Sequence, residues 1–339
     1  MGSLSGYAIT HPVYAVYDWF VKNRPQVDWQ KLFELGLGQI NHASLVSHEH
    51  PNFQIHEKNS KQGDNTRRDV YLETDRGVLH EWHLDNWQQD YFIKKPDDYR
   101  IMAHALEGIK VNLDDSAFLE SERELGEKGI TLGTVNGLGK GRTPLMVLQI
   151  DWVGLEKWSL DLALEEPAMI ELLEIMNHIK LQEFRCVAQS SAKHIKLWEN
   201  LSIETMEPIP YRTHLVPLYR QILSILEGSS KKIHVHYDGK LKIIADEIAS
   251  LDLYGIDSLT EAPEGNMSIE DARSCWPDKY LWIHPNLGWY KQSDKSLENS
   301  IRSAATAAGS ARYCLEISEE IPTDWERTIP LVLNALNNL

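Results

Sequence analysis

The chain is poor in cysteine and lacks the segments that would direct it into or across a membrane. Only Cys186, Cys275 and Cys314 occur in 339 residues, which gives no disulfide framework and suits a reducing compartment. No stretch approaches the roughly eighteen uninterrupted apolar residues of a membrane span. Residues 1–12 show no basic start followed by an apolar run, so no secretion signal is visible. We therefore expect a cytoplasmic protein that does not engage a membrane.

Positive charge is also scarce. The 34 lysines and arginines face 50 aspartates and glutamates, for a formal net charge of −16. A surface that binds nucleic-acid phosphates needs a basic excess, so we expect no nucleic-acid partner. With 42% hydrophobic residues, the chain can build one large α/β domain or two smaller ones. Neither the composition nor the patterning determines whether it forms an oligomer.

The glycine-rich segment GITLGTVNGLGKGRTP does not complete a phosphate-binding motif. Gly137 and Gly139 begin a dinucleotide fingerprint, but Arg142 stands in place of its third glycine. Lys140 is followed by Gly141, where a Walker loop has serine or threonine. The segment is predicted to be the end of a strand and a loop, which weakens an open, doubly wound nucleotide-binding fold.

Regular alternation of strands and helices begins near Lys193. Five consecutive repeats predict parallel strands near residues 194–198, 232–237, 256–260, 280–284 and 312–317. Because further elements lie upstream, closure into a (β/α)8 TIM barrel, an α/β fold, is favoured over an open sheet.

The N-terminal part is predicted to add to this barrel. Tyr14, Tyr17, Phe20 and Val21 have helical spacing, so residues 10–35 are predicted to be helical. We therefore divide the chain into an N-terminal helical extension (1–35) and a single barrel domain (36–339). Alternating residues on either side of the 75–77 turn predict a hairpin insertion. The region that follows residue 36 is predicted to be a strand and a loop. It carries four histidines whose spacing fits no regular metal pattern, so no metal site is favoured there: His42, His48, His50 and His56.

Polar side chains stand at the ends of the predicted C-terminal strands, where a barrel builds its active site. The candidates are His234, His236, Asp238, Glu261, His284, Asn286 and Glu316. A mixed set of histidines and carboxylates could hold Zn²⁺ through nitrogen and oxygen. Our candidate ligands are His236, Asp238, Glu261, His284 and Glu316. The same residues could instead form a metal-free acid–base set. For His234 we favour a hydrogen-bonded core histidine.

The run TDRGVLHEWHLDNWQQDYFIKKPDDY (74–99) is similar to the T-P-x-G-x-L and K-x-P-x-D-Y pattern of the uroporphyrinogen decarboxylase superfamily. VHYDGKLKIIADEIASLDLYGIDSLTEAP is similar to its H-x-D-G and G-(I/V)-D segments, and EISEEIPTDW to its closing motif. The likeness runs from about Gly36 to the end and is closest to the cobalamin-dependent methyltransferases, including O-demethylases of methoxylated aromatics.

The chain departs from two branches of this superfamily. It lacks the R-Q-A-G-R-Y motif that holds the substrate carboxylates of the decarboxylase, since residues 10–25 offer only Arg24. The thiol-methylating branch binds zinc through an H-x-C pair and a later cysteine. The corresponding residues here are His236, Asp238 and Ser318, so neither cysteine position carries a thiolate.

The resemblance implies a methyltransferase that moves a methyl group from a small donor, of the methoxylated aromatic type, to a corrinoid protein. No corrinoid-binding D-x-H-x-x-G signature occurs in the chain, so a partner would supply that cofactor. His236 and Glu261 are the expected catalytic residues. Glu199 and Asn200 correspond to a paired motif at the rim of the family's pocket. The alternatives are a decarboxylase-type lyase acting on another small carboxylate and a non-catalytic, degenerate barrel.

Overall fold

The computed structural model describes residues 13–137, 139–317 and 320–339. The described residues form two compact units, the first within residues 1–45, 115–134 and 190–339 and the second within residues 46–114 and 135–189. The predicted domains, residues 1–35 and 36–339, do not separate this second unit from the barrel. None of the described helices is long and apolar enough to cross a membrane.

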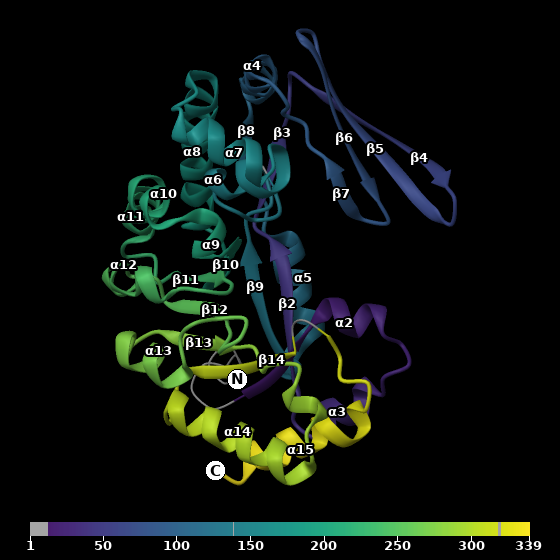
Figure 1. Ribbon diagram of the computed structural model, residues 1–339, viewed down its shortest axis with the longest axis vertical. Helices are drawn as coiled ribbons and strands as arrows, with labels where there is room; N and C mark the ends of the chain where they lie inside the picture. Colours follow the sequence, from purple (N-terminus) through teal and green to yellow (C-terminus); the bar gives the residue numbers. More distant parts are fainter. Residues whose placement is uncertain (1–12, 138, 318–319) are drawn as a thin grey trace. The chain divides into compact units, whose positions relative to one another are not determined.

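The first unit is a closed barrel of eight parallel strands (Figure 1), as predicted. In chain order the strands are β1 (Val13–Tyr17), β2 (Gly38–Ser44), β9 (Gly129–Thr134), β10 (His194–Leu201), β11 (Lys232–Tyr237), β12 (Gly255–Leu259), β13 (Tyr280–Ile283) and β14 (Tyr313–Ile317). The last five are the predicted parallel neighbours. The barrel closes through β1, which pairs with both β14 and β2.

Helices follow the strands around this barrel. They are α2 (Asp18–Asn23), α3 (Trp29–Glu34), α5 (Ser116–Leu125), α9 (Ile203–Met206), α10 (Pro208–Pro210), α11 (Val216–Leu226), α12 (Ala245–Ser250), α13 (Ile269–Cys275), α14 (Asp294–Ala308) and α15 (Trp325–Asn337). Local signals set several of their ends. The Ser268 hydroxyl accepts from the Asp271 amide at the start of α13. Gly309 ends α14 with a φ of 91°, which glycine adopts at little cost.

The predicted N-terminal helix is corrected at its beginning. Val13–Tyr17 is the barrel strand β1, and helix begins only at Asp18. Residues 14–17 are all buried, so the apolar run VYAVY carries no strand-like alternation. The spacing of Tyr14 and Tyr17 therefore looked helical although both lie on a strand.

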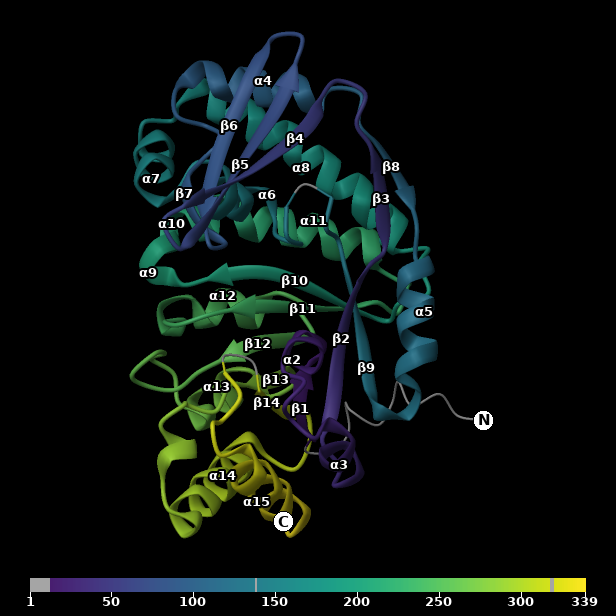
Figure 2. The same cartoon turned by 90° about the vertical axis from the view of Figure 1, so that its right-hand side faces the viewer.

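The second unit contains the predicted hairpin, which is part of a four-stranded antiparallel sheet. Its strands are β4 (Gln54–Gln62), β5 (Asn65–Thr74), β6 (Gly77–Leu84) and β7 (Trp87–Asp90), which lie side by side in Figure 2. The remaining elements are β3 (Val46–Glu49), β8 (Lys110–Leu113), α4 (Pro96–Leu106), α6 (Pro144–Met146), α7 (Leu155–Ala163) and α8 (Pro167–Val187). Helix α4 begins at Pro96, and the missing N–H of proline costs nothing in the first turn, where an N–H has no partner within the helix.

Candidate functional site

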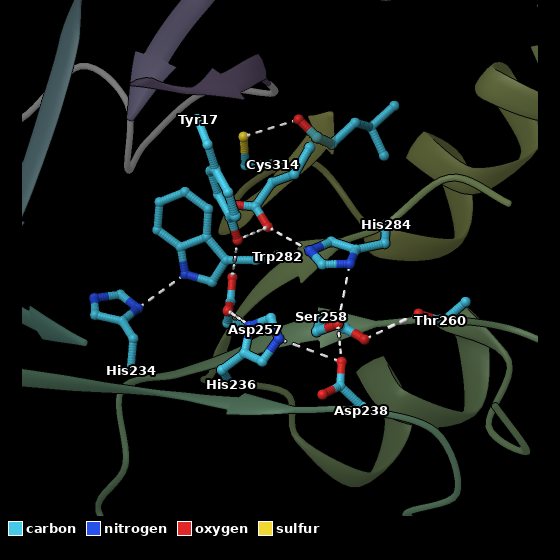
Figure 3. Close-up of polar contacts among 12 residues, drawn as sticks. Tyr17, His234, His236, Asp238, Asp257, Ser258, Thr260, Trp282, His284 and Cys314 are labelled. Atoms are coloured by element: carbon cyan, nitrogen blue, oxygen red, sulfur yellow. Dashed lines mark hydrogen bonds and ion pairs between the residues drawn. The ribbon is translucent and has the colours of Figure 1, made fainter. Parts of the chain in front are cut away.

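Polar side chains converge inside the barrel at the C-terminal ends of its strands. We name them the acid–base cluster: Tyr17, Lys196, His236, Asp238, Asp257, Ser258, His284 and Glu316. Figure 3 shows Tyr17, His236, Asp238, Asp257, Ser258 and His284 turned toward one another. They come from β1, β10, β11, β12 and β14 and from the residues that directly follow β11 and β13. All lie in the barrel unit.

A buried ion pair forms the centre of the cluster. The Lys196 ammonium lies 2.7 Å from Asp257 Oδ2, and both side chains are almost fully buried. The same ammonium donates to the Tyr17 hydroxyl at 2.8 Å and sits 3.8 Å from the centre of the Trp198 ring. Burial alone would raise the pKa of Asp257, but Lys196 and His236 hold it well below its usual range. Asp257 is therefore a carboxylate between two cations.

His236 is held in its protonated form. Its Nδ1–H donates to Asp257 Oδ2, and its Nε2 lies 3.3 Å from Asp238 Oδ1. Burial alone would lower the pKa of His236, yet the two carboxylates raise it to about 9. The Asp238 side chain is 35% exposed, so Nε2 is the side of the imidazolium that faces the outer edge of the cluster.

Glu316 and His284 form the opposite, uncharged side. His284 Nε2 and Glu316 Oε2 are 2.9 Å apart and buried. Burial and then the charge of Asp257 raise the pKa of Glu316 well above its usual range, so this carboxyl group is neutral. Burial lowers the pKa of His284 to about 3, so its ring is neutral too. Lys196 and His236 thus balance Asp257 and Asp238.

A register shift in β12 brings two successive side chains into the cluster. Asp257 and Ser258 both bond members of it, although neighbours on a regular strand point to opposite faces. The pairing of β12 with β13 slips between Ile256 and Leu259, and Ser258 has a φ of 70°. This left-handed conformation is costly for a residue with a Cβ, and such strain is concentrated at functional sites.

A layer of neutral histidines lies two residues before the cluster along β10 and β11. Trp282 Nε1–H donates to His234 Nδ1 at 2.8 Å, and His234 Nε2 lies 2.9 Å from His194 Nδ1. Burial lowers the pKa of His234 well below its usual range. A Cβ at Gly255 would lie 2.2 Å from His234 Nδ1, so glycine leaves room for the ring. His234 is therefore a core histidine, as predicted.

Four of the predicted site residues meet in the cluster: His236, Asp238, His284 and Glu316. Glu261 does not bond them. Because β12 ends at Leu259, the chain has turned before Glu261, whose carboxylate accepts from the Ile269 amide at the start of α13.

Glu199 and Asn200 also lie apart from these contacts. Strand β10 continues to Leu201 instead of ending near Trp198. Glu199 is buried and accepts from the Tyr219 hydroxyl of α11 at 2.9 Å, on the side of β10 that faces the helices. Asn200 is exposed, with a φ of 49°. Ser318 lies outside the described residues.

Tyr17, Lys196, Asp257 and Ser258 were not among the predicted site residues. For two of them the sequence held a signal. Lys196 and Asp257 are charged residues in the middle of the apolar strands HIKLW and GIDSL, and a charge buried there must find a partner. Tyr17 was predicted to be helical, and the sequence around Ser258 contains no signal that predicts the register shift.

Comparison with known proteins identifies a fold. No protein-family model matches the chain, and no curated protein matches it. A methyltransferase from Methanosarcina mazei superposes with a TM-score of 0.51 at 11% identity, over 74% of this chain and 71% of the other. The chain shares its barrel fold with this enzyme.

Two further structures align less well. They are a putative vitamin-B12-independent methionine synthase from Listeria monocytogenes (TM-score 0.43, 12% identity, 67% and 71% of the two chains) and a B12-independent methionine synthase from Shewanella sp. W3-18-1 (0.45, 10%, 99% and 95%). These scores are too low to define a shared fold.

A metal ion is one occupant to consider. Asp257, His284 and Glu316 are buried and offer ligand atoms that all lie within 4.8 Å of one another. Their hydrogen bonds are nevertheless made among protein groups. Asp257 already accepts from Lys196 and His236, and both nitrogens of His284 face Ser258 and Glu316. A dication would have to displace the Lys196 ammonium or lie beside it, so this donor set fits protons better than zinc.

We therefore expect the purified protein to contain far less than one zinc ion per chain by elemental analysis. Dialysis against a chelator should leave its melting temperature unchanged, because the cluster balances its own charges. Stoichiometric zinc that is lost in an Asp257→Asn variant, but kept in an Asp97→Asn variant of an exposed residue, would contradict this expectation and show that Asp257 holds a metal.

Proposed function

We propose that the protein is a methyltransferase that moves a methyl group from a small O-methyl donor, of the methoxylated aromatic type, to the corrinoid of a separate protein. The resemblance of the sequence to cobalamin-dependent methyltransferases supports this reading, as does the barrel shared with a methyltransferase. The observation that carries it is the protonated His236 at the mouth of the barrel. Such a group meets the main chemical need of methyl transfer from oxygen.

Breaking an O–CH₃ bond leaves both bonding electrons on oxygen. An aryl oxide is a poor leaving group, so a proton delivered to that oxygen lowers the barrier. His236 Nε2–H is the donor in this scheme, with the leaving oxygen taking the place of the weakly bonded Asp238 at 3.3 Å. Asp257 holds the ring through Nδ1 and stabilises its charge until the proton leaves.

Two further polar atoms in this region would need a partner. His42 Nε2 and Glu316 Oε1 are buried and have no hydrogen-bond partner among the described residues. The His42 ring lies 4.7 Å from that of Trp198, which in turn lies 5.2 Å from His236. Leaving such atoms unpaired costs free energy, so a ligand that bonds them gains affinity. An apolar ring with one or two polar substituents suits this set.

The corrinoid of the partner would supply the nucleophile that accepts the methyl group. Because the sequence contains no D-x-H-x-x-G signature, we expect it to stay with the partner. The net charge of −16 favours a partner with a basic docking surface.

A decarboxylase-type lyase is the competing hypothesis. It would be favoured by clustered arginines that bind substrate carboxylates. The cations of the acid–base cluster are Lys196 and His236, and both are paired with Asp257. Neither is left over for a carboxylate, which favours methyl transfer.

The test is a variant with asparagine in place of His236. Asparagine can bond Asp257 and Asp238 but cannot donate a proton to a leaving group. We expect a fall of about 10²- to 10⁴-fold in methylation of Co(I) cobalamin, followed spectroscopically with a panel of methoxyaromatics. The loss should shrink as the leaving phenol becomes more acidic, because an acidic phenol needs less protonation.

The matched control is His178→Asn, which changes an exposed histidine on α8 and should leave the rate unaltered. An equal loss for all leaving groups would contradict acid catalysis by His236. Methylation that is absent from the wild-type protein with every donor, together with release of CO₂ from a carboxylate panel, would favour the lyase.

A further inference from the structure

The orientation of four hydrogen-bonded groups in the cluster can be deduced from their chemistry. Asp238 is ionised, because His236 and then Ser258 outweigh burial and lower its pKa, so it can only accept. The Ser258 hydroxyl therefore donates to Asp238 Oδ1 at 2.5 Å. This hydroxyl also lies 3.0 Å from His284 Nδ1. Because the single hydroxyl hydrogen of Ser258 is already donated to Asp238, His284 Nδ1 must carry a proton and donate it to Ser258 Oγ.

The same reasoning fixes the inner end of the chain. A neutral imidazole carries one proton, and in His284 that proton is on Nδ1. His284 Nε2 is consequently an acceptor. Its partner at 2.9 Å is Glu316 Oε2, which must then hold the hydrogen. The deduction agrees with the neutral state that burial imposes on this carboxyl group, so one directional chain of hydrogen bonds runs from the buried Glu316 to the partly exposed Asp238.

We propose that Glu316, His284, Ser258 and Asp238 form a proton relay that restores the proton of His236 after each turnover, with Ser258 as its positioning residue. The inference rests on the proposed function, because that function makes His236 lose a proton. Figure 3 shows its outer part, in which Asp238 is linked to both Ser258 and His236. The strained backbone of Ser258 places its hydroxyl between His284 and Asp238.

Each step moves one proton and no bond between heavy atoms changes. The proton of Glu316 passes to His284 Nε2 while that of Nδ1 passes to Ser258 Oγ. The serine hydrogen passes to Asp238 Oδ1, which lies 3.3 Å from His236 Nε2 and returns the proton to the imidazole. Glu316 is left as a carboxylate and recovers its proton from solvent through the same groups in reverse.

Charged groups from the surrounding strands permit this exchange. Tyr17 of β1 donates toward both Asp257 and Glu316 at 3.3 Å, so its hydroxyl can turn to an ionised Glu316. Lys196 of β10 lies beside Tyr17 and Asp257 and offsets the added negative charge. The relay therefore stores one proton in a place that water does not reach, next to the group that consumes it.

The decisive experiment does not depend on methyl transfer. In protein labelled with ¹⁵N-histidine, the His284 signals, assigned with a His284→Gln variant, should show a protonated Nδ1 and a bare Nε2. Ser258→Ala removes the acceptor of Nδ1–H and should shift these signals toward a mixture of tautomers. Thr260→Val removes a neighbouring hydroxyl that bonds only the Ser258 carbonyl among the described residues, and should leave them unchanged. A wild-type His284 protonated on Nε2 would overturn the relay.

Turnover supplies the second readout. Ser258→Ala should lower the steady-state rate by about tenfold or more and raise its solvent deuterium isotope effect. Ser258→Gly accepts the φ of 70° without strain and leaves room for water, so it should fold as well as the wild type and recover part of the rate. Equal rates for the alanine variant and the wild type would refute the relay, even if the tautomer is as deduced. If no donor is turned over, the proposed function fails, while the ¹⁵N result still decides the relay.

Discussion

Replacing Lys196 by methionine should lower the free energy of unfolding by about 3–5 kcal/mol, because it removes one of the two cations that stabilise the buried Asp257 carboxylate. Lys196 and Asp257 are 0% and 2% exposed, and methionine keeps the length of the side chain but not its charge. Asp257 would retain His236 as its nearest cation. Urea denaturation at neutral pH measures the change.

The reason for the loss can be separated from a packing effect. A double variant, Lys196→Met with Asp257→Asn, removes both charges and should recover much of the lost stability. Lys240→Met provides the matched surface control, since Lys240 pairs with Glu204 at 2.6 Å but both side chains are about half exposed. It should change the unfolding free energy by less than about 1 kcal/mol. A double variant that is less stable than Lys196→Met would contradict this account.

Lowering the pH from 7 to 5 should reduce the free energy of unfolding by about 6 kcal/mol, a large part of the stability of a typical domain. Three buried histidines outside the acid–base cluster cause the effect, because within the cluster the loss from His284 is opposed by Glu316, whose raised pKa favours the folded state as the pH falls. Burial lowers the pKa of His42 to about 4, that of His194 to about 3 and that of His234 well below its usual range. In the unfolded chain each has a pKa near 6.5 and binds a proton below it. Each group therefore contributes stability above pH 6.5 that is lost as the pH falls, by about 2 kcal/mol at pH 5.

Urea unfolding at several pH values measures this dependence. His42→Gln removes one titrating group and should weaken it by about a third. The exposed His178→Asn should not alter it. His236 has the opposite pH dependence, because its pKa of about 9 in the folded protein exceeds the unfolded value. Its contribution to the free energy of unfolding is complete below pH 6.5 and is lost as the pH rises through 9. An unfolding free energy that stays constant between pH 7 and 5 would show that these histidines are protonated in the folded protein.

Most of the barrel could be predicted from the sequence because its signals are local. The five C-terminal strands alternate with helices whose ends carry Ser268 and Gly309, and each appears close to its predicted range. The hairpin at residues 75–77 was predicted for the same reason. Strand β1 was wrongly predicted to be helical because a strand buried on both faces does not alternate between apolar and polar residues.

The candidate site was predicted in part. His236, Asp238, His284 and Glu316 were found because polar residues at the ends of parallel strands meet at one rim. Glu261 and Glu199 do not join these contacts because the prediction misplaced the end of β12 by one residue and the end of β10 by three. On a strand, an error of one residue is enough to turn a side chain to the opposite face.

The sequence by itself determined the order of strands and helices, the caps that end several helices and the charge balance of the chain, since each depends on neighbours in the sequence. Only the tertiary structure decided which charges pair. Lys196 meets a tyrosine 179 residues away, and Asp257 and Ser258 reach one cluster because β12 slips its register. Closure of the barrel sets those distances, and the distances in turn set the protonation of His236 and Glu316.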